Sequence, residues 1–123
     1  MANAVEITDA TFEAEVVQSD KPVLVDFWAP WCAPCRTVGA VLDQLSGERD
    51  DLKIVKINID DNQDQAVKHG VMVLPTIILY KEGEPVGKLQ GGVPPTAIAR
   101  LLNEHVPAPE PTPAAEQEAV AAE

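Results

Sequence analysis

Hydrophobic and polar positions along the 123-residue chain follow two different periods, and these periods predict strands that alternate with helices. Short runs rich in Val and Ile are typical of strands, whereas apolar residues spaced three and four apart are typical of helix faces. The predicted strands are Val5–Ile7, Pro22–Trp28, Lys53–Ile59, Thr76–Tyr80 and Val86–Gln90. The predicted helices are one that follows Thr8, then Pro34–Leu45, Asp64–His69 and a last one from Pro94 or Pro95 to His105. This order predicts an α/β domain whose central mixed sheet of four to five strands is flanked by about four helices on both faces.

Local signals mark several element boundaries. Thr8 and Asp9 offer an N-cap for the first helix, whose apolar side includes Phe12, Val16 and Val17. Ser46-Gly47 is a typical end for the second helix, so we expect that helix to stop there. Residues 81–84 (Lys-Glu-Gly-Glu) predict a hairpin turn between the last two strands.

The pattern changes from Pro107 onward. Proline then occupies every second position up to Pro113, and the remainder consists of Ala, Glu and a few other residues, so no core-forming face exists. We therefore predict one folded domain over residues 1–106 and a disordered acidic tail rich in Pro, Ala and Glu over residues 107–123. Most tails of this composition only keep a protein soluble, and a docking segment is the alternative.

The charge balance limits the classes of partner. The chain has 9 basic and 20 acidic residues and a net charge of −11, which argues against nucleic acid or an anionic membrane surface. The N-terminus lacks a basic start and an apolar run, so no signal peptide is predicted. No uninterrupted apolar stretch approaches the roughly 20 residues of a membrane helix. We expect a cytoplasmic monomer.

Both cysteines of the chain lie in one motif, Trp-Cys-Ala-Pro-Cys at residues 31–35, between a predicted buried strand and a predicted helix. A disulfide here closes a loop of four residues and contributes about 2 kcal/mol, less than longer loops provide. In a reducing compartment such a pair is catalytic or metal-binding more often than structural. Its position at a helix N-terminus favours a thiolate, so the pair is predicted to be a redox centre.

The two cysteines have different predicted tasks. Cys32 lies at the helix N-terminus and is expected to be the more exposed, so it is the candidate attacking thiol. Cys35 lies one turn further and is expected to resolve the mixed disulfide. A zinc site needs about four ligands, and His69 and His105 lie too far along the chain for a standard spacing. We therefore predict no metal and no cofactor besides the cysteine pair.

Asp26 interrupts the run Val-Leu-Val-Asp-Phe-Trp, which otherwise has the pattern of a fully buried strand. Alternation places Asp26 on the same face as Leu24 and Trp28. Burial of an unpaired carboxyl disfavours its charged form, so we expect the pKa of Asp26 to be raised. From the residues alone, a proton-transfer group and a structural Asp bonded to the backbone are equally supported.

These features resemble the thioredoxin family over residues 3 to 106. The resemblance rests on five segments: Val23–Cys35, Lys56–Asp60, Gly70-Val71, Leu74–Thr76 and Gly91-Gly92. A lone Cys-x-x-Cys is a weak signal, but one that follows this strand and precedes a Pro-Thr strand by about forty residues is a strong one. The resemblance implies a thioredoxin fold and a protein-disulfide reductase that acts on disulfide-containing proteins and is recharged by a thioredoxin reductase.

The resemblance also implies roles that the residues alone do not give. Asp26 would relay a proton to and from Cys35 beneath it, with Lys56 as the partner of Asp26. The bond before Pro75 would be cis, although sequence alone predicts trans because only about 5–6% of such bonds are cis. The implied docking surface consists of Trp31, Ala33, Pro34, Leu74, Pro75, Gly91 and Gly92. We expect Trp31 to be exposed and Trp28 to pack in the core.

Four positions depart from the family pattern: Ala33, Ala40, Val73 and Gln90. Because the two cysteines, the buried acid and the proline loop are intact, these departures bear on the choice of partner. Two alternatives stay open. One is a thiol oxidant or isomerase, and the other is a non-catalytic binding subunit with a docking tail.

Overall fold

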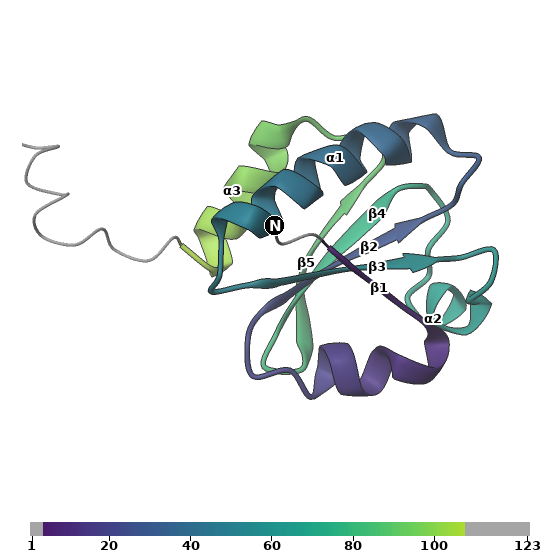
Figure 1. Cartoon of the computed structure of the whole chain (residues 1–123), viewed down its shortest axis with the longest axis horizontal. Helices are drawn as coiled ribbons and strands as arrows, with labels where there is room; N and C mark the ends of the chain where they lie inside the picture. The colour runs from purple at the N-terminus through teal and green to yellow at the C-terminus, as the bar shows by residue number, and fades with distance from the viewer. Residues whose placement is uncertain (1–3, 108–123) are drawn as a thin grey trace, which may run out of the picture.

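A five-stranded mixed sheet forms the centre of the computed structural model, which describes residues 4–107 (Figure 1). The strands are β1 (Val5–Ile7), β2 (Val23–Trp28), β3 (Lys53–Asn58), β4 (Thr76–Lys81) and β5 (Glu84–Gln90). Their spatial order is β1-β3-β2-β4-β5; the first three run parallel, and β4 is antiparallel to both β2 and β5. The predicted mixed α/β sheet is confirmed. The tail predicted for residues 107–123 lies outside the described residues, Pro107 excepted.

Helices cover both faces of the sheet. They are η1 (Asp9–Thr11), η2 (Glu13–Val17), α1 (Ala33–Glu48), α2 (Gln63–Lys68) and α3 (Pro95–His105). In Figure 1, α1 and α3 lie on one face, while α2 and the η1–η2 segment lie on the other. Each face has its own apolar core. Leu24 of β2 belongs to the core under α1 and α3, whereas Val25 belongs to the core on the opposite face. The alternation along β2 therefore follows the predicted period of two.

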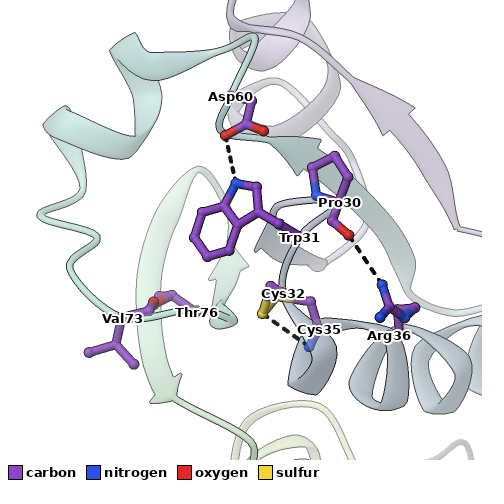
Figure 2. The surroundings of a disulfide bond; sticks show 8 residues. All are labelled: Pro30, Trp31, Cys32, Cys35, Arg36, Asp60, Val73 and Thr76. Atoms are coloured by element: carbon purple, nitrogen blue, oxygen red, sulfur yellow. Dashed lines mark hydrogen bonds between the residues drawn. A yellow bond between two sulfur atoms is a disulfide. The ribbon is translucent and has the colours of Figure 1, made fainter.

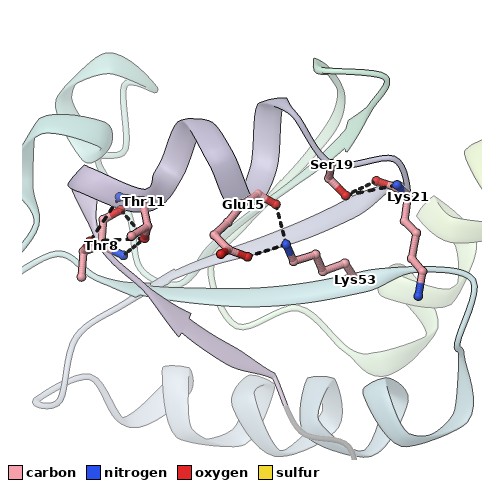
Figure 3. A network of polar contacts seen from close by, with 6 residues as sticks. All are labelled: Thr8, Thr11, Glu15, Ser19, Lys21 and Lys53. Carbon is pink, nitrogen blue, oxygen red and sulfur yellow. Dashed lines mark hydrogen bonds and ion pairs between the residues drawn. The ribbon is translucent and has the colours of Figure 1, made fainter.

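The first helical segment differs from the single helix that the sequence predicted. A reciprocal capping box between Thr8 and Thr11 closes a tight first turn (Figure 3). The chain then widens, so that the Gln18 N–H donates to the Glu13 carbonyl. Lys53 of β3 donates to the Glu15 carbonyl at 2.9 Å and pairs with its carboxylate. The core side is still as predicted, because Phe12 and Val16 are buried.

Two element boundaries also differ from the predicted ones. Helix α1 continues through Gly47 to Glu48 and ends where the Arg49 N–H donates to the Leu45 carbonyl. The hairpin turn is limited to Glu82 and Gly83, whose φ angles are 55° and 79°. A two-residue turn of this kind matches the twist of the flanking strands, so β4 and β5 pair up to the turn itself.

Candidate active site

The two cysteines form a disulfide at the N-terminus of α1, with their Cα atoms 5.3 Å apart (Figure 2). Cys32 is the N-cap residue of α1, and its sulfur accepts a hydrogen bond from the Cys35 N–H at 3.2 Å. The Cys32 N–H in turn donates to the Ala29 carbonyl at 3.1 Å, which fixes the loop between β2 and α1. The unpaired N–H groups of a helix N-terminus favour negative charge, so this position stabilises a thiolate on Cys32 after reduction.

Both cysteines are buried, with exposed fractions of 5% for Cys32 and 3% for Cys35. The difference has the predicted direction but is small, because the sulfur atoms are joined and share one apolar setting. Ala29 completes this small cluster, and Trp28, Ile59 and Leu74 pack against it. A partner protein must therefore contact the residues around the disulfide before it can reach the sulfur atoms.

A loop before β4 approaches the disulfide from the other side. The Leu74–Pro75 peptide bond is cis, the isomer that the family resemblance implied. The Gly91 N–H donates to the Pro75 carbonyl at 2.8 Å, and the Thr76 hydroxyl donates to the Val73 carbonyl at 2.6 Å. These bonds connect the loop to the start of β4 and to the loop after β5, and Leu74 contacts the cysteine cluster.

The surroundings of the disulfide are largely apolar and partly exposed. Trp31 is 68% exposed, as predicted, and its indole N–H donates to the Asp60 carboxylate at 3.2 Å (Figure 2). A Cβ built on Gly92 would lie 3.4 Å from the Pro34 Cβ, so the loop after β5 lies against the start of α1. Of the seven predicted docking residues, Trp31, Ala33, Pro34 and Gly92 are exposed, Leu74 and Gly91 are half-buried and Pro75 is buried.

Asp26 lies on the α1 side of β2 and is 1% exposed. Within residues 4–107 neither of its carboxyl oxygens accepts a hydrogen bond, so the alternative of a backbone-bonded structural Asp does not hold for this part of the chain. Desolvation by burial raises the pKa of Asp26 to about 7. The nearby Lys56 charge opposes this rise in pKa, and the Glu6 and Asp43 carboxylates add to it.

A cavity of about 310 Å³ connects Asp26 with Cys35. It is lined by Asp26, Trp28, Cys35, Arg36, Gly39, Ala40, Asp43 and Lys56. The cavity brings the buried Asp26 carboxyl and the Cys35 side chain to one space. Lys56 lies here too, but its ammonium pairs with Asp43 at 3.6 Å.

Three acids at the site were not identified from the sequence: Glu6, Asp43 and Asp60. Asp43 follows Cys35 by eight residues, two steps of four. This spacing is a signal that could have placed Asp43 on the same side of the helix as Cys35. Glu6 gives no comparable signal, because its position depends on how β1 pairs with β3. Its carboxylate accepts the Trp28 indole N–H at 3.1 Å, and Trp28 is half-buried where the sequence analysis placed it in the core.

Residues 4–107 contain no cluster of three or more His, Cys, Asp or Glu side chains that could hold a metal ion. In the same range no helix has the length and apolar character needed to cross a membrane.

A family model described as Thioredoxin matches residues 3–104. The chain belongs to the thioredoxin family. Thioredoxin 1 of Synechococcus elongatus is 45% identical over 107 residues, which cover 86% of this chain and 100% of that relative. The thioredoxin of Haemophilus influenzae is 46% identical with the same coverage, and that of Mycobacterium bovis is 43% identical over 104 residues, 84% of this chain and 90% of the relative.

Thioredoxins are thiol–disulfide oxidoreductases, and this protein is therefore one as well. They need no cofactor, because the redox-active cysteine pair belongs to the chain itself. The adjacent Cys32 and Cys35 give this thioredoxin the arrangement of a dithiol–disulfide reductase.

Proposed function

We propose that this thioredoxin reduces disulfides in client proteins through Cys32 and Cys35, and that a thioredoxin reductase restores its dithiol. One observation carries the proposal: Cys32, at the N-cap of α1, follows the exposed Trp31 and is joined by a disulfide to Cys35, which lines the cavity that contains Asp26. An attacking thiol, a docking surface and a buried proton acceptor thus meet at one disulfide.

The first step is attack by the Cys32 thiolate on one sulfur of a client disulfide. A bond forms between the Cys32 sulfur and the client sulfur, and the second client sulfur leaves as a thiolate. The helix N-terminus supports this step because it stabilises the thiolate form of Cys32. The product is a mixed disulfide between the two proteins.

The second step is resolution by Cys35. Its thiol gives its proton to the Asp26 carboxylate and its sulfur attacks the Cys32 sulfur, so the Cys32–Cys35 bond forms and the bond between Cys32 and the client sulfur breaks. The client leaves with both sulfurs as thiolates, which take up protons from water. Two electrons pass from the cysteine pair to the client. Because the pKa of Asp26 is about 7, the carboxyl can both accept and return a proton near neutral pH.

The client would dock on the apolar surface formed by the seven residues predicted from the family resemblance. An extended client segment would pair with the backbone at Leu74 as an added strand, and apolar contacts with Trp31 and Pro34 would complete the complex. Support comes from the exposed Trp31 ring and from the contact of Leu74 with the cysteine cluster. Lys56 would modulate Asp26 from the neighbouring strand.

The residues between the cysteines favour a reductant over an oxidant. An oxidant stabilises its reduced form, chiefly through the thiolate of the attacking cysteine. Ala33 has no side-chain donor and Pro34 has no backbone N–H. Of the groups near the cysteines, only the helix N-terminus and the remaining backbone amides therefore stabilise the Cys32 thiolate. We further propose that the protein acts as a monomer in the cytoplasm, a reducing compartment that keeps such a pair available as a dithiol.

The experiment is a turnover assay in which a disulfide-containing protein is reduced by the full chain, with a thioredoxin reductase and NADPH as electron source. We expect NADPH oxidation that depends on both the client disulfide and this protein. Absence of turnover, although the reductase is active with another thioredoxin, would contradict the proposed function.

The same assay tests the assignment of residues 107–123 as a solubilising tail. A variant that ends at Pro107 keeps the Val106 carbonyl, which accepts a hydrogen bond from Arg49 at 2.8 Å. This variant should unfold at the same temperature as the full chain and give the same turnover within about twofold. A docking subunit would instead lose a specific complex on truncation, and a large loss of thermal stability would contradict a tail of either kind.

A further inference from the structure

Charged side chains form a row across the sheet beneath α1. The strand register pairs Glu6 of β1 with Lys56 of β3, and Lys56 with Asp26 of β2. Residues opposite one another in register project to the same face of a sheet, so the three side chains share the α1 side. Asp43 reaches the row from above, because its carboxylate lies 3.6 Å from the Lys56 ammonium.

Lys56 is the cation of this row, and it is in register with Asp26. Lys56 lies on the neighbouring strand β3, and Glu6 lies one strand further away, on β1. The other groups at Asp26 come from α1, which contributes Cys35, Arg36 and Asp43, whereas the β4 residue in register with Asp26 is the apolar Ile77. The Arg36 guanidinium donates to the Pro30 carbonyl at 3.2 Å and so points to the loop before α1 (Figure 2).

The Lys56 ammonium is held on the α1 side of the row. A Cβ built on Gly39 would lie 3.3 Å from the Lys56 Nζ, so the absence of a side chain at Gly39 makes room for the ammonium beside the helix. The Asp43 carboxylate accepts the Ala4 N–H at 3.3 Å and the Glu6 carboxylate accepts the Trp28 indole N–H at 3.1 Å. Each acid is thus fixed by a hydrogen bond to a group other than Lys56.

We propose that Asp43 and Glu6 are positioning residues of the thiol–disulfide reaction: they hold the Lys56 ammonium away from Asp26 and so keep this carboxyl able to take up and return the Cys35 proton. This inference rests on the proposed function, because it assigns a purpose to Asp26 that only disulfide exchange requires. It adds two residues, from β1 and from α1, to the catalytic arrangement without contact to the client.

The sign of the effect follows from charge. Without the Asp43 charge the ammonium loses its partner and turns to Asp26, and an opposite charge at close range favours the ionised carboxyl. The pKa of Asp26 then falls and the carboxylate becomes a weaker base for the Cys35 proton. Loss of the Glu6 charge acts in the same direction but less strongly, because Glu6 shares no ion pair with Lys56 in the described residues.

The test measures the titration of the Asp26 carboxyl carbon by NMR in the oxidised full chain. We expect the midpoint to move down by roughly half a unit to one unit in Asp43→Asn and by less in Glu6→Gln, and to move up in Lys56→Met. The exposed Asp50, in the turn after α1, gives the control, and Asp50→Asn should leave the midpoint unchanged. The pH at which the Cys35 resolving step reaches half its maximal rate should move with the midpoint.

A double variant separates competition for Lys56 from plain repulsion between acids. In the Lys56→Met background, Asp43→Asn should move the midpoint by at most about half as much as in the wild type, because no ammonium is left to redirect. Equal shifts in the two backgrounds would overturn the positioning role. An unmoved midpoint would overturn this inference and leave the proposed function intact. A moved midpoint with an unchanged rate profile would overturn the proton relay through Asp26, and the positioning role with it.

Discussion

Cys32→Ser is expected to abolish turnover, whereas Cys35→Ser is expected to attack a client disulfide once and remain joined to it. The reason is the position of the two sulfur atoms. Cys32 is the N-cap of α1, where a thiolate is stabilised, and Cys35 lies inside the first turn beside the Asp26 cavity. In the reductase-coupled assay both variants should lose roughly a thousandfold or more of the wild-type rate.

The two variants differ in the products that they form. With a disulfide-containing client, Cys35→Ser should accumulate a mixed disulfide that is visible on a non-reducing gel, and Cys32→Ser should form none. Thr37→Ser, which removes only an exposed methyl group from the same helix, is the matched control and should retain wild-type turnover. Equal alkylation rates of Cys32 and Cys35 in the reduced wild type would contradict this division of roles.

The second large effect is expected from Asp26→Asn, which should raise the free energy of unfolding at neutral pH by roughly 3–4 kcal/mol. The pKa of Asp26 rises from 3.8 to about 7 on folding, because burial removes water from the carboxyl. Ionisation of this group therefore opposes folding, and the amide cannot ionise.

The pH window follows from these two values. Below pH 3.8 the carboxyl is protonated in the folded and in the unfolded chain, so the wild type loses nothing. Between pH 3.8 and about 7 only the unfolded chain ionises, so wild-type stability falls as the pH rises, and above about 7 the loss is constant. Urea unfolding of wild type and Asp26→Asn at several pH values should show a difference that grows across this window. A difference that does not depend on pH would contradict the raised pKa.

The same variant should be slower although it is more stable. Without the Asp26 carboxylate the Cys35 thiol loses its buried proton acceptor, so we expect the resolving step to slow by roughly tenfold or more at neutral pH. Stopped-flow fluorescence of Trp28 and Trp31 during reduction of a client follows this step. An unchanged rate across neutral pH would reject the proton-relay role of Asp26.

The elements with strong periodicity could be predicted from the sequence. The run from Val23 to Trp28 is apolar apart from Asp26, and the structure places this residue on the predicted face of β2. The first helical segment could not be predicted in the same way, since Phe12 and Val16 have a spacing of four that fits more than one kind of helix. The periodicity indicates which side is buried, and the hydrogen bonds depend on local turn chemistry.

The row of charged residues and the cis bond depend on contacts between residues far apart in the sequence, which a local pattern does not predict. Glu6, Lys56 and Asp26 come from three strands, and only the parallel pairing of β1, β3 and β2 places them in one row. The cis bond before Pro75 has no local signature, because proline is compatible with both isomers and the surroundings decide between them. The resemblance to the thioredoxin family predicts the cis isomer, whereas the residues alone predict trans.

The reduction potential of the Cys32–Cys35 pair decides whether the protein is a reductant or an oxidant. We expect a value near the roughly −270 mV of thioredoxins, because Ala33 and Pro34 add no donor to the Cys32 thiolate. The protein is equilibrated with glutathione buffers of increasing reducing strength, and its thiols are trapped with an alkylating agent and counted. At a poise of about −200 mV, similar to the endoplasmic reticulum, nearly all of the pair should be oxidised. A pair that stays reduced in that buffer would contradict the reductase and favour the oxidant.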